Sequence, residues 1–276
     1  PVVKLGRHTA RHHFIDDSQT VLLSQKFEEG DFHCASTVAV RVVDKESEIT
    51  SKDDQKRTIR LPARKGTRTI LVSSAASWSD PADTQIVAGE LIRETIRRGT
   101  EVILLAHRRW WKNLWSRTFV DLKSADGIAQ FMGKLRYLQL YLMASSSRGA
   151  LPPKWNGSIF SVDGDRRNWG AQFWVWTTEI SYFPLYAADA TELTNPFFDM
   201  YVKQLPATKK AAVQRWGVKG AYFLEAGPFD GPVVLPEKIA AEYQDVYLGR
   251  KTIKELSPAA RALGRYECVL TQFTEE

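Results

Sequence analysis

The sequence predicts a chain of mixed α and β structure, in which a strand-rich N-terminal part precedes a helical remainder. Two observations predict this fold class. Short β-branched runs separated by turn residues fill the first 78 residues, and apolar residues recur at helical spacing from residue 81 onward. The change of period places the boundary between the two parts near residue 80.

The N-terminal part contains several short runs rich in Val, Ile and Thr. These runs cover residues 21–23, 37–43, 56–61 and 67–73. In one of them, Val38, Val40 and Val42 alternate with other residues, as expected of a half-buried strand. Several short strands separated by turn signals are typical of an antiparallel sandwich, so we expect residues 1–80 to form part of one.

Helix signals begin after Trp78. Pro81 follows two residues that can cap a helix, and Gly99 is expected to divide the stretch up to Trp115 into two helices. A further helix is expected over 128–144, where Phe131, Leu135, Leu138 and Leu142 form one stripe. Because this helix is apolar on other faces too, it is predicted to be packed on both sides.

Later helices are marked by prolines and cap residues. A helix is predicted over 168–186, limited or kinked at Pro184, and another begins at Asn195-Pro196 and runs to about Leu205. Residues 216–229 form an aromatic, Gly-rich loop. The last stretch looks helical from Ser257-Pro258 onward.

Aromatic residues concentrate between Trp155 and Pro184, in WNGSIFSVDGDRRNWGAQFWVWTTEISYFP. Seven of the nine tryptophans lie between Trp110 and Trp176. A pyranose has an apolar face that stacks on such rings and hydroxyls that bond to acids and amides. The density of tryptophans among charges therefore favours a sugar site, although each ring taken alone suits an ordinary core.

Composition and residue patterns argue against several classes of protein and of site. No run of eighteen apolar residues occurs, so no membrane span is predicted. The net charge is +6, but the basic residues are spread along helix-like stretches beside acids, which disfavours a nucleic-acid groove. The HxxxHH pattern at His8 lies in strand-like sequence, and Cys34 and Cys268 are far apart. We predict no metal and no cofactor, and a disulfide between the cysteines stays open.

Four segments carry a resemblance: HRRWWKNLWSRTFVDL, YLQLYLMASSSRGALPPKWNGSIF, DRRNWGAQFWVWTTEISYFPLYAADATEL and GAYFLEAGPFDG. In this order they resemble segments of the six-hairpin glycoside hydrolases, in a largely uncharacterised branch related to the α-L-fucosidases. In that superfamily a β-sandwich precedes an (α/α)6 barrel. The resemblance implies a sandwich portion over 1–80, linker helices over 81–120 and the N-terminal, incomplete part of the barrel over 121–276.

The resemblance also implies site residues. The PPKWNGSIF loop would place Lys154, Trp155 and Asn156 near the sugar, and the DRRNWGAQFW segment adds Asp165, Arg166 and Trp169. The fucosidases position the attacking water with paired asparagines, where this chain has Val175 and Thr177; Thr177 can still bind a water. A weak match of TQFTEE to the general-acid segment points to Glu275.

Chemistry adds two carboxyl candidates. Glycoside hydrolysis normally needs a pair of carboxyl groups that flank the scissile bond. Glu225, after an apolar run, and Glu179, between Trp176 and Phe183, are the acids for which burial among aromatic rings is expected to raise the pKa. Each also suits a structural hydrogen-bonding role. Trp174 and Trp176 are the expected stacking platforms.

These observations predict a glycoside hydrolase-like protein that acts on an oligo- or polysaccharide by inverting general acid/base hydrolysis, in an extracellular or periplasmic location. The alternative is a non-catalytic carbohydrate-binding or scaffold protein on the same fold. A third possibility, single-stranded nucleic-acid binding, predicts steep salt dependence. The chain is also expected to be a fragment that does not hydrolyse glycosides by itself. Oligomeric state, sugar and linkage stay open.

Overall fold

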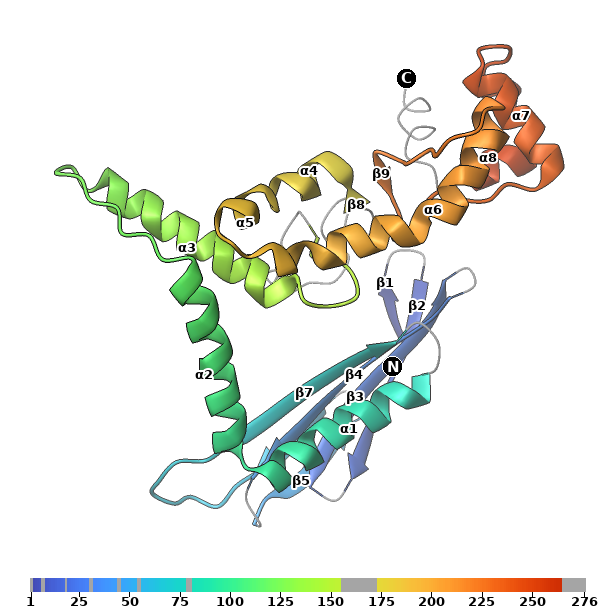
Figure 1. Ribbon diagram of the computed structural model, residues 1–276. Coiled ribbons are helices and arrows are strands. Elements are labelled where there is room, and N and C mark those ends of the chain that lie inside the picture. Colours follow the sequence, from blue (N-terminus) through green and yellow to red (C-terminus); the bar gives the residue numbers. More distant parts are fainter. Residues whose placement is uncertain are drawn as a thin grey trace. The chain divides into compact units, whose positions relative to one another are not determined.

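The computed structural model describes residues 2–5, 8–17, 19–29, 32–43, 46–53, 56–77, 81–154 and 173–264 (Figure 1). The chain divides into two compact units, Pro1–Lys112 and Asn113–Glu276. It combines antiparallel sheets with helices, as predicted. The domain boundaries expected at residues 80 and 120 stay predictions.

The first unit is built on a five-stranded antiparallel sheet (Figure 1). Its strands, in spatial order, are β1 (Val2–Leu5), β2 (His8–Asp17), β3 (Thr20–Glu29), β4 (Phe32–Val42) and β7 (Ile70–Ser77). A separate two-stranded sheet pairs β5 (Glu48–Asp53) with β6 (Lys56–Arg60). The strand-rich start is therefore confirmed, and the HxxxHH stretch lies in a strand, as expected.

Helix α1 (Pro81–Arg98) packs on one face of this sheet. Leu22, Ala39, Ala88 and Ile92 form the buried core between them. The buried Thr37 hydroxyl bonds to the Thr84 hydroxyl on α1 at 2.9 Å, which satisfies two polar groups that burial would otherwise penalise.

The opposite face of the sheet carries several exposed apolar side chains. Leu23 pairs with Val38, and Val40 pairs with Val72 in the neighbouring ladder, so these side chains share one face. Leu23, Val38 and Val72 are 39%, 40% and 65% exposed. Among the described residues, the covered face of the sheet packs against helix α1 and not against a second sheet, so the sandwich stays a prediction.

Two helices follow α1. Gly99, at φ 88°, separates α1 from α2 (Thr100–Arg117), and α3 (Ile128–Ser146) comes next. These bounds confirm the predicted helices and the break at Gly99. Packing of α3 on both sides is not found within the described residues, because its stripe is open: Phe131, Leu135 and Leu138 are 58%, 43% and 49% exposed.

The predicted helix over 168–186 is wrong at Phe173 and Trp174, and its expected start at residue 168 lies outside the described residues. Phe173–Trp174 forms strand β8, and two short helices follow, α4 (Val175–Ile180) and α5 (Phe183–Ala187). Strand β8 pairs with β9 (Ala226–Gly227), so a tertiary ladder overrides the local helical period. Pro184 lies in the first turn of α5, where its missing N–H costs nothing, and the break before it agrees with the prediction.

The longest helix of the described chain, α6 (Asn195–Trp216), follows the short 3₁₀ helix η3 (Thr191–Thr194). Its start agrees with the expected Asn195-Pro196 signal, but it continues through Pro206 rather than ending near Leu205. Gly217, in the left-handed region at φ 68°, ends it. The burial of Thr208, Ala211 and Ala212 beyond Pro206 outweighs the free-energy cost of a proline inside the helix.

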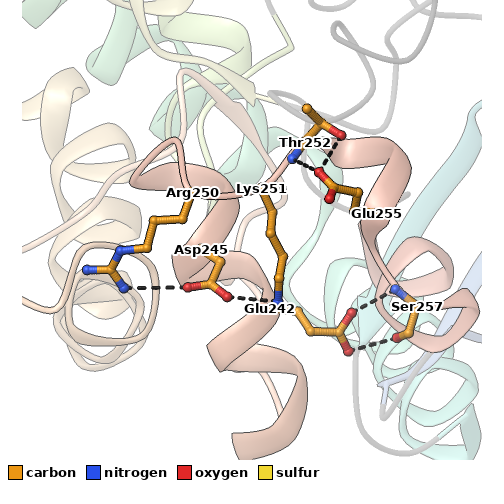
Figure 2. Close-up of polar contacts among 7 residues, drawn as sticks. All are labelled: Glu242, Asp245, Arg250, Lys251, Thr252, Glu255 and Ser257. Atoms are coloured by element: carbon orange, nitrogen blue, oxygen red, sulfur yellow. Dashed lines mark hydrogen bonds and ion pairs between the residues drawn. The ribbon is translucent and has the colours of Figure 1, made fainter.

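Three short helices close the described chain: α7 (Glu237–Tyr247), η4 (Ile253–Glu255) and α8 (Pro258–Gly264). A network of polar contacts joins them (Figure 2). Glu242 accepts bonds from the Ser257 N–H and hydroxyl at 2.7 and 2.8 Å. The Ser257 hydroxyl in turn accepts the N–H of Ala260 at 3.2 Å, which confirms the predicted cap.

Candidate functional site

The candidate site forms where two segments far apart in the sequence pair through their backbones. Trp174 opposes Ala226 in the β8–β9 ladder, and the Val175 N–H donates to the Glu225 carbonyl oxygen at 2.9 Å. In Figure 1, β8 lies at the start of α4, and β9 lies in the chain that follows α6. The ladder therefore joins the predicted Trp174–Glu179 segment to the predicted Glu225 loop.

The two carboxyl groups differ in their surroundings. The Glu225 side chain is exposed, which contradicts the expected burial among aromatic rings. Glu179, on α4, is partly buried, and its negative charge acts on Tyr201 of α6. Burial, together with the charge of Glu179, raises the pKa of Tyr201 to about 12, so the phenol stays protonated near neutral pH.

Lys154 lies against an aromatic ring of the site. Its ammonium nitrogen is 3.8 Å from the ring centroid of Phe173, the first residue of β8. Phe173 is 5% exposed, so the cation covers a buried ring. A cation–π contact of this kind contributes on the order of 0.5–2 kcal/mol and holds Lys154 beside β8. The expected place of Lys154 near a sugar stays a prediction.

The two tryptophans expected to stack on a sugar differ in their exposure. Trp176 is 63% exposed on α4, whereas Trp174 is partly buried. Thr177 is partly buried and Thr178 is buried, so the hydroxyl available beside Trp176 is that of Thr177. Its predicted bond to a water stays a prediction.

A small cavity lies behind the ladder. Its volume is about 10 Å³, close to the least that one water molecule needs. The lining residues come from β8, α6 and the loop around β9: Phe173, Tyr201, Gln204, Leu224, Gly227, Pro228 and Gly231. The cavity is too small for a sugar ring, so a saccharide would lie outside it and reach it with a single group.

Gln204 is the central polar residue of this cavity and is 4% exposed. Its amide nitrogen donates to the carbonyl oxygens of Phe229 and Pro228, at 3.1 and 3.4 Å. Gly231, at φ 89°, allows this packing, since a Cβ there would lie 3.2 Å from Gln204 carbons. The loop after β9 is thus fixed to α6 through one side chain.

Sequence reasoning did not single out Tyr201 or Gln204, although both lie inside the helix that it predicted from Asn195 to about Leu205. A signal was present. Phe197, Met200, Gln204 and Thr208 follow helical spacing, so the glutamine is a polar residue on a buried stripe. A buried amide needs partners, and the carbonyls of the neighbouring loop supply them.

The remaining predicted site residues lie outside the described residues. They are Trp155, Asn156, Asp165, Arg166, Trp169 and Glu275. Whether they gather with Glu179 and Glu225 around one concavity, as expected, stays a prediction.

Comparison with known proteins adds no relative. Neither the models of protein families nor the curated proteins contain a match to this chain. Within the described residues, no helix is long and apolar enough to cross a membrane. In the same residues, His, Cys, Asp and Glu do not gather in groups of three that could hold a metal ion.

Proposed function

We propose that this chain is part of a glycoside hydrolase-like protein that acts on an oligo- or polysaccharide by inverting general acid/base hydrolysis. The observation that supports this most is the β8–β9 ladder, which brings the Glu225 loop to the segment carrying Trp176 and Glu179. An exposed indole beside two carboxylate-bearing segments suits a sugar, which presents both an apolar face and hydroxyls.

In this proposal Trp176 stacks on the sugar face, and Glu179 and Glu225 are the carboxyl pair. An inverting enzyme holds such groups about 6.5–9.5 Å apart, which leaves room for a water. Lys154, held on the Phe173 ring, contributes a hydrogen-bond donor at the same place. Asn156, Asp165, Arg166, Trp169 and Glu275 are further candidates from the resemblance.

We also propose the fold that the resemblance implies, part of a sandwich and the first hairpins of an (α/α)6 barrel. Two exposed apolar surfaces support it: the sheet face of Leu23, Val38 and Val72, and the stripe of Phe131 and Leu135 on α3. Apolar surfaces of this kind usually pack against another layer. An extracellular or periplasmic location is part of the same proposal.

The second candidate is a non-catalytic carbohydrate-binding protein. It is favoured by the exposure of the Glu225 side chain, since an exposed carboxyl lacks the burial that makes a general acid at neutral pH. Val175 and Thr177, where the fucosidases have asparagines, favour it too. The aromatic part of the site is the same in both candidates.

Aryl fucosides and galactosides test the proposal, with this chain and any longer natural form assayed in parallel. An active form should lose at least about 100-fold in kcat on Glu179→Gln or Glu225→Gln, as expected when general acid/base groups are removed. Glu101→Gln, an exposed acid on α2, is the matched control. Sugar binding without turnover selects the second candidate, and absence of both overturns the proposal.

A further inference from the structure

We propose that the cavity between α6 and the β9 loop is a subsite for one hydroxyl oxygen, held between the Gln204 carbonyl oxygen and the Tyr201 hydroxyl. Water occupies it in the unliganded protein, and a sugar hydroxyl replaces or contacts that water in the complex. The sugar part of this inference rests on the proposed function, whereas the water part does not.

Gln204 supplies the acceptor. Both bonds of its amide nitrogen go to the Pro228 and Phe229 carbonyls, which fixes the orientation of the amide and leaves Oε1 as the unused acceptor. No group in the described part of the chain donates to Oε1. Gln204 is 96% buried, so an oxygen that reaches its amide does so through the cavity. A hydroxyl that reaches Oε1 supplies the donor that this acceptor lacks within the described residues.

Tyr201 supplies the donor. Tyr201 lines the same cavity, and its hydroxyl makes no hydrogen bond within the described residues. Because burial and the charge of Glu179 raise its pKa to about 12, the hydroxyl keeps its proton at physiological pH. A hydroxyl group between the two residues accepts a hydrogen bond from the Tyr201 hydroxyl and donates one to Gln204 Oε1. The remaining donor of Tyr201 and the remaining acceptor of Gln204 are then both used.

The size of the cavity selects the ligand. The space that a water molecule can reach is about 10 Å³, which fits one oxygen atom. Two glycines of the cavity wall are tightly packed: a Cβ at Gly227 would lie 3.0 Å from Leu224, and one at Gly231 would lie 3.2 Å from Gln204. Phe173 forms part of the wall and carries Lys154 on its ring, which places the subsite beside the proposed sugar site.

The water part is tested without any sugar. A high-resolution crystal structure of the unliganded protein should show one ordered oxygen at hydrogen-bond distance, about 2.7–3.2 Å, from both Gln204 Oε1 and the Tyr201 hydroxyl. Tyr201→Phe should lose or displace it, while Tyr186→Phe, an exposed tyrosine of α5, should keep it. A cavity without this oxygen overturns the inference.

The sugar part is tested by titrating methyl α-L-fucoside, methyl β-D-galactoside and their monodeoxy analogues, followed by NMR shifts. One deoxy analogue should bind about 10-fold more weakly than its parent, as for one lost hydrogen bond. Tyr201→Phe should weaken the parent sugar by a similar factor and leave that analogue unchanged. Tyr186→Phe should change neither.

The outcomes separate the two proposals. Equal losses for parent and analogue in Tyr201→Phe overturn the hydroxyl subsite but not sugar binding. If neither sugar family binds while the ordered oxygen is present, the proposed function fails for these sugars and the sugar part of the subsite fails with it. Thermal unfolding of Tyr201→Phe within a few degrees of the unsubstituted chain excludes misfolding as the cause.

Discussion

The Val175 main-chain N–H donates a 2.9 Å hydrogen bond to the carbonyl oxygen of Glu225. A two-residue ladder is too short to be stable by itself, so other contacts must support it. Helix α6 provides them, because the Tyr222 N–H donates to the Thr208 carbonyl at 3.0 Å and Gln204 holds the loop after β9. Helix α6 thus positions the loop that carries Glu225.

Gly231→Ala should destabilise the protein by about 1–3 kcal/mol, as strain and a forced core contact usually do. The residue has φ 89°, which side chains rarely adopt, and its new Cβ would lie 3.2 Å from Gln204 carbons. Urea unfolding measures the change. The same substitution should remove the ordered oxygen of the subsite by shifting the Gln204 amide.

Gly220→Ala is the matched control, because a Cβ there meets nothing within 4 Å. It should change the free energy of unfolding by no more than about 0.5 kcal/mol. Equal effects of the two substitutions would show that the approach of Gly231 to Gln204 does not fix the loop.

The sequence predicted local structure where start and stop signals are strong. Pro81, Gly99 and Ser257 mark helix boundaries that the structure contains, because caps and glycines act within a few residues. The sequence did not predict local structure where contacts with residues distant in the chain determine it. The helix predicted over 168–186 included Phe173, but pairing with Gly227, over 50 residues away, forms a strand there.

The site was predictable only in part, for the same reason. Residue chemistry proposed Glu179, Glu225 and Trp176 and the resemblance proposed Lys154; the ladder brings the segments of Trp176, Glu179 and Glu225 together, while their roles stay predictions. The cavity was not predictable, since Gln204 and Tyr201 become neighbours of Pro228 only through tertiary packing. Burial depends on the same packing, which is why the exposure of Glu225 differs from the expectation.

Alkaline pH should destabilise the second unit through buried tyrosines. Burial raises the pKa of Tyr182 to about 12 from an ordinary 10.0, so the folded state favours the protonated phenol. The resulting stability is fully present below about pH 10 and is lost as pH rises toward 12. Near-ultraviolet absorbance of the phenolate and circular dichroism, followed together, should show late ionisation accompanied by unfolding.

The substitution Tyr182→Phe tests the contribution of Tyr182 separately from that of the other buried tyrosines. Its hydroxyl bonds to Ser147 at 2.7 Å, and the Ser147 hydroxyl also donates to the Leu193 carbonyl at 2.8 Å, so Ser147 keeps one partner. We expect a loss of about 0.5–1.5 kcal/mol at neutral pH. The late rise in phenolate absorbance should fall by the amount of one tyrosine, and an unchanged late rise contradicts the assignment to Tyr182.

Acid pH should loosen the contact between α7 and α8. The bonds from the Ser257 N–H and hydroxyl hold the pKa of Glu242 below its ordinary value of 4.5. Because the folded pKa is lowered, the stabilisation is present above pH 4.5 and is lost as pH falls below it. Thermal unfolding between pH 3 and 6 should show this slope, and Glu242→Gln should flatten it. An unchanged slope in Glu242→Gln, with exposed Glu237→Gln as control, contradicts the assignment.

The last prediction concerns Arg215, whose side chain is fully buried on α6. Its guanidinium donates to the Val233 carbonyl at 2.9 Å and lies 5.8 Å from the Tyr222 ring centroid. Burial lowers the pKa of Arg215, which reflects the cost of holding the charge away from water. The contact with Val233 fixes the far end of the loop that carries Glu225.

Arg215→Ala should therefore cost about 2–4 kcal/mol, because it leaves the Val233 carbonyl unpaired and opens a cavity. Arg215→Met keeps much of the apolar stem and should cost less, while exposed Lys209→Ala on the same helix should cost at most about 0.5 kcal/mol. Urea unfolding measures all three. If Arg215→Ala is as mild as Lys209→Ala, the guanidinium does not hold the loop, and the support of the Glu225 segment must come from contacts such as those of Gln204, the Tyr222–Thr208 bond and the ladder.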